Sequence, residues 1–534
     1  MKRFYLVSVT TDVTSYLVQF GDIKIQLLIY IFLYTYESTD PQGDTYSCIE
    51  LTLVEQRQKK MAPPHFLLVT FPAQGHVNPS LRFARRLIKT TGTRVTFVAC
   101  VSVFHNSMIP NHNNVDNLSF LTFSDGFDDG GISTYEDRQK RTANLKVNGD
   151  KALSEFIEAS RNGDSPVTCV IYTILLNWAP KVARRFQLPS ALLWIQPALV
   201  FDIYYNHFMG NNSVFKLTNL SSLEIRDLPS FLTPSNTNKA AYDSFQEMME
   251  FLIEETNPKI LINTFDSLEP EALTAFPNID MVAVGPLLPT EIFSGSAKSV
   301  EDQSSSYTLW LDSKTESSVI YVSFGTMVEL SKKQIEELAR ALIEGKRPFL
   351  WVITDKSNRE TKTEGEEETE IEKIAGFRHE LEEVGMMVSW CSQIDVLSHR
   401  AVGCFVTHCG WSSTLESLVL GVPVVAFPMW SDQPTNAKLL EESWKTGVRV
   451  RENEEGLVER GEIRRCLEAV MEDKSVELRE SAKKWKRLAI EAGGEGGSLD
   501  KNMEAFVEEI CGDSHVQRLC EAEDVKVNDK RVGV

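Results

Sequence analysis

The stretch "GCFVTHCGWSSTLESLVLGVPVVAFP" (residues 403–428) decides the fold that we expect for this chain. It opens with an apolar run typical of a buried strand, continues into a segment with helical character, and closes on a second apolar run. A strand, a helix and another strand in this order indicate a βαβ unit of a parallel sheet. The turn after the first strand holds a histidine, a cysteine and a glycine, followed by two serines.

The same alternation continues towards the N-terminus. Residues 66–71 and 94–100 are apolar runs that we interpret as strands. Between them, Asn78 and Pro79 predict the N-cap and the first-turn proline of a helix.

A second cycle of strands and helices begins at residues 318–325. Its first two strands are expected at 318–325 and 348–354. A capping box of Ser331 and Gln334 predicts the start of the helix that joins these two strands. Residues 287–307 are rich in serine, proline and charge, which is typical of a linker. Two parallel-sheet domains joined there are expected to face a cleft.

Length and composition narrow the class of protein. A chain of 534 residues with 42% hydrophobic composition is expected to form two domains. Its net charge of -20 disfavours nucleic acid as a partner. The nine cysteines are scattered and form no C-x-x-C pair, which disfavours disulfides or zinc and fits a cytoplasmic location. Cys409 could be a nucleophile beside His408, but we favour a small buried hydrophobe.

Residues 1–60 need a separate interpretation. Lys24 and Gln26 cut the apolar run at 23–36 to about ten residues, short of the roughly twenty that a membrane helix needs. Met61 then opens "MAPPHFLLVTF", which is typical of the start of a fold. We expect residues 1–60 to lie outside the fold, as a disordered segment or a start placed too far upstream, or else as a weak membrane-associating leader.

The turn in the first stretch suits an anionic phosphate group. The amide groups and the dipole at the start of a helix attract anions, and His408, Gly410, Ser412 and Ser413 surround that place. Plain capping is the alternative, because Ser413 and Glu416 have capping-box spacing, and spacing alone leaves both interpretations open. Neither a dinucleotide fingerprint nor a P-loop follows any expected strand.

A longer stretch carries a family resemblance. "WCSQIDVLSHRAVGCFVTHCGWSSTLESLVLGVPVVAFPMWSDQ" (residues 390–433) resembles the signature box of plant UDP-dependent glycosyltransferases in its length, its Trp-x-x-Gln, its His-Cys-Gly-Trp and its closing Asp-Gln. The similarity runs from residue 61 to about residue 511. The stretches at residues 61–92, "LLWIQPA" (192–198) and "NTFDSLEPEAL" (263–273) resemble the branch that includes indole-3-acetate glucosyltransferases.

The resemblance implies an α/β GT-B fold, with two Rossmann-like parallel-sheet domains that face a cleft. The expected parts are an N-terminal acceptor-binding domain at 61–286, the linker at 287–307, a UDP-sugar-binding domain at 308–495, a C-terminal helix packed back on the first domain at 496–511, and a tail at 512–534.

The same resemblance assigns the sugar-donor site. It implies that Trp390 stacks on uracil beside Cys391 and Gln393, that Glu416 binds the ribose, that Thr326, His408, Ser412 and Ser413 contact the diphosphate, and that Trp411, Asp432 and Gln433 surround the glucose. Many relatives have Asn in place of Ser412, so one diphosphate contact is expected to be longer or lost. No metal is needed in this scheme, because helix amides, His408 and hydroxyls can stabilise the leaving UDP.

On the acceptor side, the resemblance implies that His76 is the general base. Relatives commonly orient that histidine with an Asp, whereas this chain has Thr173 at the matching position. A hydroxyl stabilises an imidazolium far less than a carboxylate does, so the base is expected to be weaker. Gln196 lines the sugar or acceptor side, or else it is a polar residue beside the core.

A weaker base matters least for carboxylic acids, which have a pKa near 4 to 5 and arrive ionised. We therefore expect inverting transfer from UDP-glucose to the carboxylate of indole-3-acetate, a benzoate such as p-aminobenzoate, or abscisate. The alternatives are O-glucosylation of flavonoid or other phenolic hydroxyls and, in another class, a sugar-nucleotide-binding partner with little turnover. We expect a monomer without membrane insertion, with UDP-glucose and a small acceptor as its partners.

Overall fold

The computed structural model describes residues 29–39, 45–55, 63–105, 108, 115–129, 135–210, 222–294, 306–353, 370–472 and 476–512. The chain divides into two compact units, Met1–Pro63 and Pro64–Val534. In the first unit, β1 (Ile29–Thr39) and β2 (Thr45–Glu55) pair as an antiparallel hairpin. Both strands contain aromatic and β-branched residues, which favour strands. The expectation that residues 1–60 are a disordered segment or a start placed too far upstream stays a prediction.

The second unit begins with a parallel sheet of seven strands in the order β5-β4-β3-β6-β7-β8-β9. The strands are β3 (His65–Val69), β4 (Arg94–Cys100), β5 (Leu118–Phe123), β6 (Val167–Thr173), β7 (Ser190–Trp194), β8 (Lys259–Ile262) and β9 (Asp280–Ala283). The strand order reverses between β3 and β6, and ligands bind at such a reversal in open α/β sheets.

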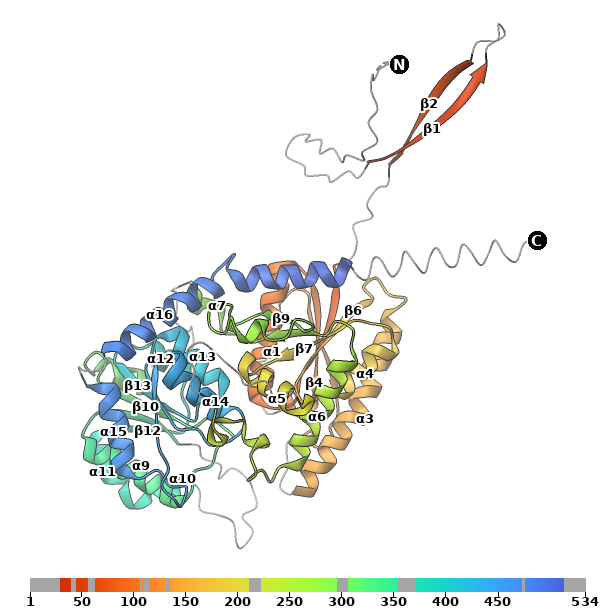
Figure 1. Cartoon of the computed structure of the whole chain (residues 1–534). Helices are drawn as coiled ribbons and strands as arrows, with labels where there is room; N and C mark the ends of the chain where they lie inside the picture. Colours follow the sequence, from red (N-terminus) through yellow and green to blue (C-terminus); the bar gives the residue numbers. More distant parts are fainter. Residues whose placement is uncertain are drawn as a thin grey trace. The chain divides into compact units, whose positions relative to one another are not determined.

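Helices follow these strands and pack around the sheet (Figure 1). They are α1 (Gln74–Thr91), α2 (Val101–His105), α3 (Tyr135–Ser160), α4 (Trp178–Arg185), α5 (Ala198–Met209) and α6 (Lys239–Glu254), with short 3₁₀ turns at Ile225–Asp227, Ser230–Leu232 and Ala272–Thr274.

A second parallel sheet has six strands in the order β12-β11-β10-β13-β14-β15, with its reversal between β10 and β13. Its strands are β10 (Val319–Ser323), β11 (Phe349–Val352), β12 (Met386–Val388), β13 (Val402–Thr407), β14 (Val424–Ala426) and β15 (Gly447–Arg449). Two Rossmann-like parallel-sheet domains are thus confirmed.

The helices around this second sheet are α8 (Ser306–Asp312), α9 (Lys332–Gly345), α10 (Glu370–Ile374), α11 (Arg378–Val384), α12 (Gln393–Ser398), α13 (Trp411–Leu420), α14 (Gln433–Lys438), α15 (Arg460–Met471) and α16 (Val476–Gly493). The expected linker contains α7 (Thr290–Phe293), and its residues 295–305 lie outside the described residues, as do residues 513–534 of the expected tail.

Two predicted helix starts differ in detail. Helix α1 begins after Ala73 rather than at Asn78, because the amides of His76 and Val77 already donate to the Ala73 carbonyl at 2.8 and 2.9 Å. Pro79 therefore lies inside α1.

At α9, Ser331 caps the helix as predicted, since its hydroxyl accepts from the Gln334 amide at 3.2 Å. The side chain of Gln334 does not complete the capping box. Instead, it bonds the amide and the carbonyl of Val458 at 2.9 and 2.8 Å.

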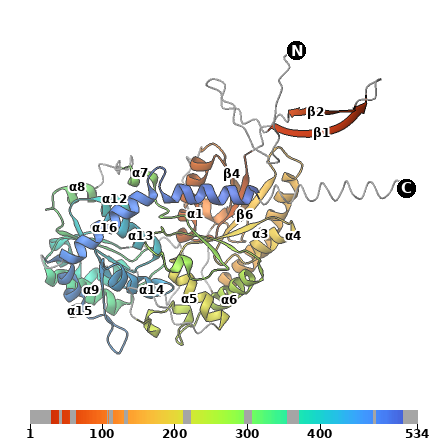
Figure 2. The same cartoon turned by 45° about the horizontal axis from the view of Figure 1, so that its top comes forward.

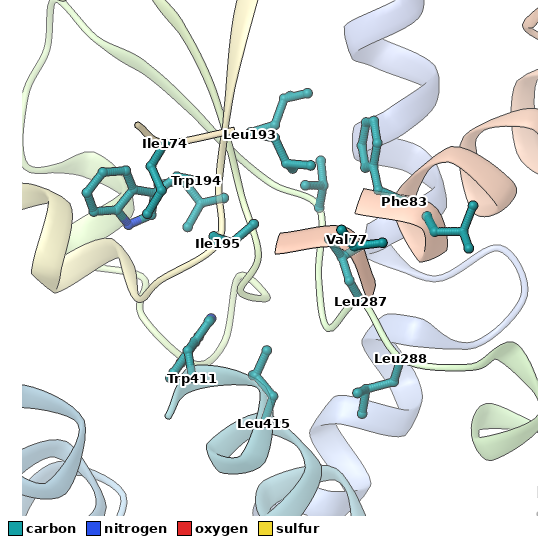
Figure 3. Close-up of a cluster of buried hydrophobic side chains, with 14 of the residues drawn as sticks. Val77, Phe83, Ile174, Leu193, Trp194, Ile195, Leu287, Leu288, Trp411 and Leu415 are labelled. Carbon is teal, nitrogen blue, oxygen red and sulfur yellow. The ribbon is translucent and has the colours of Figure 1, made fainter. Parts of the chain in front are cut away.

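The two domains share a buried apolar cluster (Figure 3). Val77 and Phe83 from α1, Leu287 from the chain after β9, and Trp411 and Leu415 from α13 all belong to it. It brings the starts of α1 and α13 to the same region, and each of these helices follows a strand at the reversal of its sheet.

The last helical segment, residues 498–512, returns to the N-terminal sheet (Figures 1 and 2). Asp500 accepts from Arg86 of α1 at 2.6 Å, and the ring of Phe506 packs edge-on against Phe66 of β3, with 6.0 Å between centroids. Lys259 at the start of β8 is paired with Asp280 and with Glu509 of the returning helix.

Candidate active site

His76 and Thr173 meet at the reversal of the N-terminal sheet. His76 lies in the first turn of α1 after β3, and Thr173 is the buried last residue of the neighbouring β6. The ring nitrogen Nδ1 of His76 lies 3.3 Å from Oγ1 of Thr173. The same oxygen accepts the backbone amide of Phe71 at 3.1 Å, so the structure brings the predicted pair together and orients the hydroxyl.

The His76 ring is neutral near pH 7. The residue is only partly exposed, and the loss of water around the ring lowers its pKa to about 3. The ring of Phe71 lies 5.1 Å away between centroids, which gives it an apolar neighbour. A neutral imidazole has one bare nitrogen and one N–H, so the bond to Thr173 decides which nitrogen is bare.

The turn between β13 and α13 has the features of an anion site. Gly410 is the N-cap of α13 and contributes no side-chain cap, so the first-turn amides are open to a ligand. A Cβ atom on Gly410 would lie 2.6 Å from Nε2 of His408, and one on Gly325, where φ is +72°, would lie 2.9 Å from Cε1. Both glycines are therefore needed to leave room for the His408 ring.

The thiol of Cys409 is buried at φ +62°, and burial raises its pKa to about 12. A thiolate nucleophile is therefore disfavoured, and the small-hydrophobe interpretation holds. Thr326 is exposed in the loop directly after Gly325, and Ser412 is partly exposed in the first turn of α13.

Plain capping by Ser413 was the wrong alternative. Because Gly410 is the N-cap, Ser413 lies inside the helix, and its hydroxyl accepts from Nε2 of Gln393 at 2.9 Å. The same nitrogen donates to Oε2 of Glu416 at 2.7 Å. Burial raises the pKa of Glu416, whereas the nearby Arg82, with Nη1 3.9 Å from Oε1, opposes that rise.

Two residues near Glu416 were not predicted. Tyr321 of β10 donates its hydroxyl to Oε1 of Gln393 at 3.3 Å, and Arg82 comes from α1 of the other domain. The only signal in the sequence for Tyr321 as a site residue is its hydroxyl within an otherwise apolar strand. The sequence gives no signal for Arg82, because its partner Glu416 is distant along the chain.

Trp390 and Cys391 lie just after β12, where Trp390 is exposed and Cys391 is buried. The indole of Trp390 is 72% exposed, which is unusual for a residue type that is mostly buried. Cys391 is buried, and its sulfur lies 3.6 Å from the Tyr321 hydroxyl oxygen. The exposed indole face can stack on a planar base.

Asp432 and Gln433 stand at the start of α14. Oε1 of Gln433 accepts the amides of Met429 and Trp430 at 2.9 and 3.0 Å. Burial raises the pKa of Asp432 to about 6, and Oδ2 of this residue accepts from Asn436 at 2.7 Å.

The side chain of Trp411 contacts the N-terminal domain. Its buried indole N–H donates to the Asn263 carbonyl of the N-terminal domain at 2.7 Å. Gln196, also from that domain, donates to the Ser431 hydroxyl at 3.4 Å, and its Oε1 has no partner within the described residues. This contact places Gln196 beside the residue that precedes Asp432, and both interpretations of Gln196 stay open.

The described ranges contain no group of three or more His, Cys, Asp or Glu residues that could hold a metal ion. Among the helices of the same ranges, none has the length and apolarity required to cross a membrane.

Comparison with known proteins agrees with this site. Residues 273–483 match the family model described as UDP-glucoronosyl and UDP-glucosyl transferase. The chain is 92% identical over 468 residues to UDP-glycosyltransferase 75B1 of Arabidopsis thaliana, which covers 88% of this chain and 100% of the relative. It is 48% identical to phloretin 4'-O-glucosyltransferase of Malus domestica, over 84% of this chain and 98% of the relative.

Among solved structures, Os79 from O. sativa in complex with U2F and trichothecene matches with a TM-score of 0.73 at 32% identity, over 83% of this chain and 100% of that chain. A structure of Os79 in complex with UDP matches with a TM-score of 0.72. The fold, the open start of α13 and these likenesses agree, and this chain belongs to the plant UDP-glycosyltransferase family, with a GT-B fold and a UDP-sugar as its donor.

Proposed function

We propose that this UDP-glucosyltransferase transfers glucose to the carboxylate of a small acid and forms a glucose ester with inversion at the anomeric carbon. Indole-3-acetate is the leading acceptor, and benzoates such as p-aminobenzoate and abscisate are the others. The observation that carries this proposal is the hydroxyl of Thr173 at the ring nitrogen of His76, where a carboxylate would favour the chemistry of a base.

The hydrogen bonds of Thr173 support one tautomer of His76. The Thr173 oxygen accepts from Phe71, and its single proton can be donated to Nδ1 of the ring. Nε2 then carries the ring proton. In the opposite tautomer, Nδ1–H donates to Oγ1, and the Thr173 proton is left without an acceptor among the described residues. The hydroxyl thus favours a ring that presents N–H, rather than a lone pair, at Nε2.

Such a ring suits an acceptor that is already ionised. A carboxylate with a pKa near 4 to 5 has no proton to lose at neutral pH, and it can accept a hydrogen bond from Nε2–H. One carboxylate oxygen forms a bond to the anomeric carbon while the bond from that carbon to the UDP oxygen breaks, and UDP leaves with the electron pair. No proton has to be taken from the acceptor.

We assign the sugar donor to the groups around α13 and α14. Trp390 stacks on uracil beside Cys391 and Gln393, and Glu416 accepts from the ribose hydroxyls. The diphosphate lies at the start of α13 with Thr326, His408, Ser412 and Ser413, while Asp432, Gln433 and Gln196 contact the glucose. The exposed Trp390 face, the uncapped start of α13 and the unpartnered Oε1 of Gln196 support this assignment.

Glucosylation of phenolic hydroxyls is the second candidate, because a relative at 48% identity is named for phloretin. A phenol must lose its proton during the attack, so this activity needs a lone pair at Nε2 of His76. The two candidate functions therefore differ in whether Nε2 of His76 carries a proton, as suits a carboxylate acceptor, or a lone pair, as a phenol needs.

A competition experiment separates them. The full chain is given UDP-glucose with equal amounts of indole-3-acetate and a simple flavonol, and products are analysed by mass spectrometry before and after mild alkali. We expect a hexose adduct of indole-3-acetate that alkali destroys. An alkali-stable adduct on the flavonol alone would reject the ester in favour of the second candidate. Binding of UDP-glucose without UDP release on either acceptor would reject turnover of both and favour a sugar-nucleotide-binding partner.

A further inference from the structure

The N-terminal domain contacts the C-terminal domain at the turn that precedes α14. We name residues 226–231 the latch and residues 429–433 the sugar turn. The amide of Ser230 donates to the Ser431 carbonyl at 2.8 Å, and the amide of Ser431 donates to the Ser230 hydroxyl at 2.7 Å. Phe231 packs edge-on against Trp430, with 6.1 Å between ring centroids.

A buried carboxylate anchors the latch. Asp227 is 1% exposed, and its Oδ1 accepts from Nη1 of Arg449 at 2.6 Å. Nζ of Lys438 lies 3.6 Å from the other carboxylate oxygen, and the hydroxyl of Thr435 donates to the Asp227 carbonyl at 2.6 Å. All three partners belong to the C-terminal domain, and Thr435 and Lys438 are on α14 itself.

The sugar turn has a backbone conformation that needs support. Ser431 has φ +61°, in the left-handed region that residues other than glycine seldom adopt. Gln433 holds the turn from within through the amides of Met429 and Trp430. Ser230 holds it from the other domain, at the residue just before Asp432.

We propose that the latch positions the sugar turn, so that Asp227 and Ser230 of the acceptor-binding domain set the recognition of the donor sugar. The inference rests on the proposed assignment of Asp432 and Gln433 to glucose. Asp227 and Ser230 are positioning residues, because they act through the sugar turn. The groups assigned to uracil and ribose, Trp390 and Glu416, lie on other elements, so the latch acts on the hexose and not on the nucleotide.

The test compares nucleotide and sugar recognition in the full chain. Ser230→Ala removes the acceptor of the Ser431 amide, and Asp227→Asn removes the charge opposite Arg449 and Lys438. For both variants we expect the Kd of UDP to stay within about twofold and the KM of UDP-glucose to rise about five- to tenfold, as suits the loss of one buried hydrogen bond. The preference for UDP-glucose over UDP-galactose should fall by a similar factor.

Matched variants control for unrelated effects. Ser235→Ala makes the same change a few residues away on an exposed serine, and Asp243→Asn removes an exposed carboxylate on α6. Both should keep wild-type constants. Ser230→Ala is the milder of the two latch variants, so it keeps the test valid if Asp227→Asn does not fold.

Gln433→Ala separates the latch from the sugar assignment. If this variant raises the KM of UDP-glucose while the latch variants change nothing, the latch is wrong, and a role of the sugar turn in glucose recognition stands without it. If it leaves the KM and the sugar preference unchanged, the assignment itself fails and the latch with it. An equal loss of UDP and UDP-glucose affinity in Ser230→Ala would also overturn the latch, because it would indicate a general loss of structure.

Discussion

Nδ1 of His76 lies 3.3 Å from the hydroxyl oxygen of Thr173, across the point where the order of the N-terminal strands reverses. A carboxylate at this distance could only accept from a neutral or protonated ring. A hydroxyl can also donate, and the amide of Phe71 already occupies one of its lone pairs. The residue beside the histidine therefore influences which acceptors react.

Thr173→Asp should move the enzyme towards phenols. A carboxylate would accept Nδ1–H, leave Nε2 bare and stabilise the imidazolium, and a positioned base contributes about 10²- to 10⁴-fold. We expect the ratio of kcat/KM for a flavonol to that for indole-3-acetate to rise at least about tenfold. Thr173→Ser, which keeps the hydroxyl, should keep the wild-type ratio. An unchanged ratio in Thr173→Asp would show that Thr173 does not select the acceptor.

Trp390→Ala should weaken nucleotide binding without affecting the fold. The side chain is 72% exposed, so its removal costs little packing. Stacking of a base on an aromatic ring contributes about 1–3 kcal/mol, which corresponds to a rise of roughly 5- to 150-fold in the Kd of UDP. Calorimetric titration measures the Kd, and the melting temperature should not change. Trp390→Phe should recover most of the affinity, and wild-type affinity in Trp390→Ala would remove the indole from the uracil site.

Gly410→Ala should disable the diphosphate site. The new Cβ would lie 2.6 Å from Nε2 of His408 and would force the ring out of its place at the start of α13. Loss of one preorganised donor to a developing negative charge lowers kcat by about 10²- to 10³-fold, and we expect a loss of that order. Gly461→Ala is the control, because its Cβ would meet no atom within 4 Å. Near-normal turnover in Gly410→Ala would show that His408 is not needed there.

The two active-site histidines should make the protein sensitive to acid. Burial lowers the pKa of His76 to about 3 and that of His408 to about 4, whereas an unfolded histidine has a pKa of 6.5. Between about pH 6.5 and pH 4 the unfolded chain therefore binds more protons than the folded one, and stability falls as the pH falls. The two histidines together should account for a loss on the order of a few kcal/mol.

Urea unfolding of the wild type at pH 7.5, 6 and 5 measures this dependence. His76→Gln and His408→Gln should each show a shallower fall in the free energy of unfolding than the wild type, since glutamine does not titrate. Parallel curves for the wild type and both variants would contradict the lowered pKa values.

Much of the fold follows from local patterns in the sequence. The strands β4 and β10 were predicted to within about two residues of their observed ends, and β13 to within about one residue of its start, because continuous apolar runs bounded by turn residues are typical of buried parallel strands. The start of α1 was misplaced. Asn78 and Pro79 are strong local signals for a helix start, but the chain turns into the helix directly after the N-cap Ala73, with His76 already in the first turn.

Contacts between distant residues explain what the sequence could not predict. The resemblance implies that Trp411 lies around the glucose, which stays a prediction, and the contact of its indole with the Asn263 carbonyl, 148 residues away, could not be predicted. The contacts of Asp227 with Arg449 and of Arg82 with Glu416 likewise join the two domains. Such pairs depend on how the domains pack together, and no spacing along one segment encodes them.

The returning helix has a consequence for how the chain is made. Arg86 lies near the start of the first domain, and its partner Asp500 follows 414 residues later. At about 5–20 residues per second, a ribosome needs roughly 20 to 80 seconds to connect them. Throughout that time the guanidinium of Arg86 and the surface of Phe66 that Phe506 will cover lack their final contacts. Lys259, once it is made, lacks its partner Glu509 until the end of the chain is synthesised. The half of the enzyme that is synthesised first therefore completes its structure last.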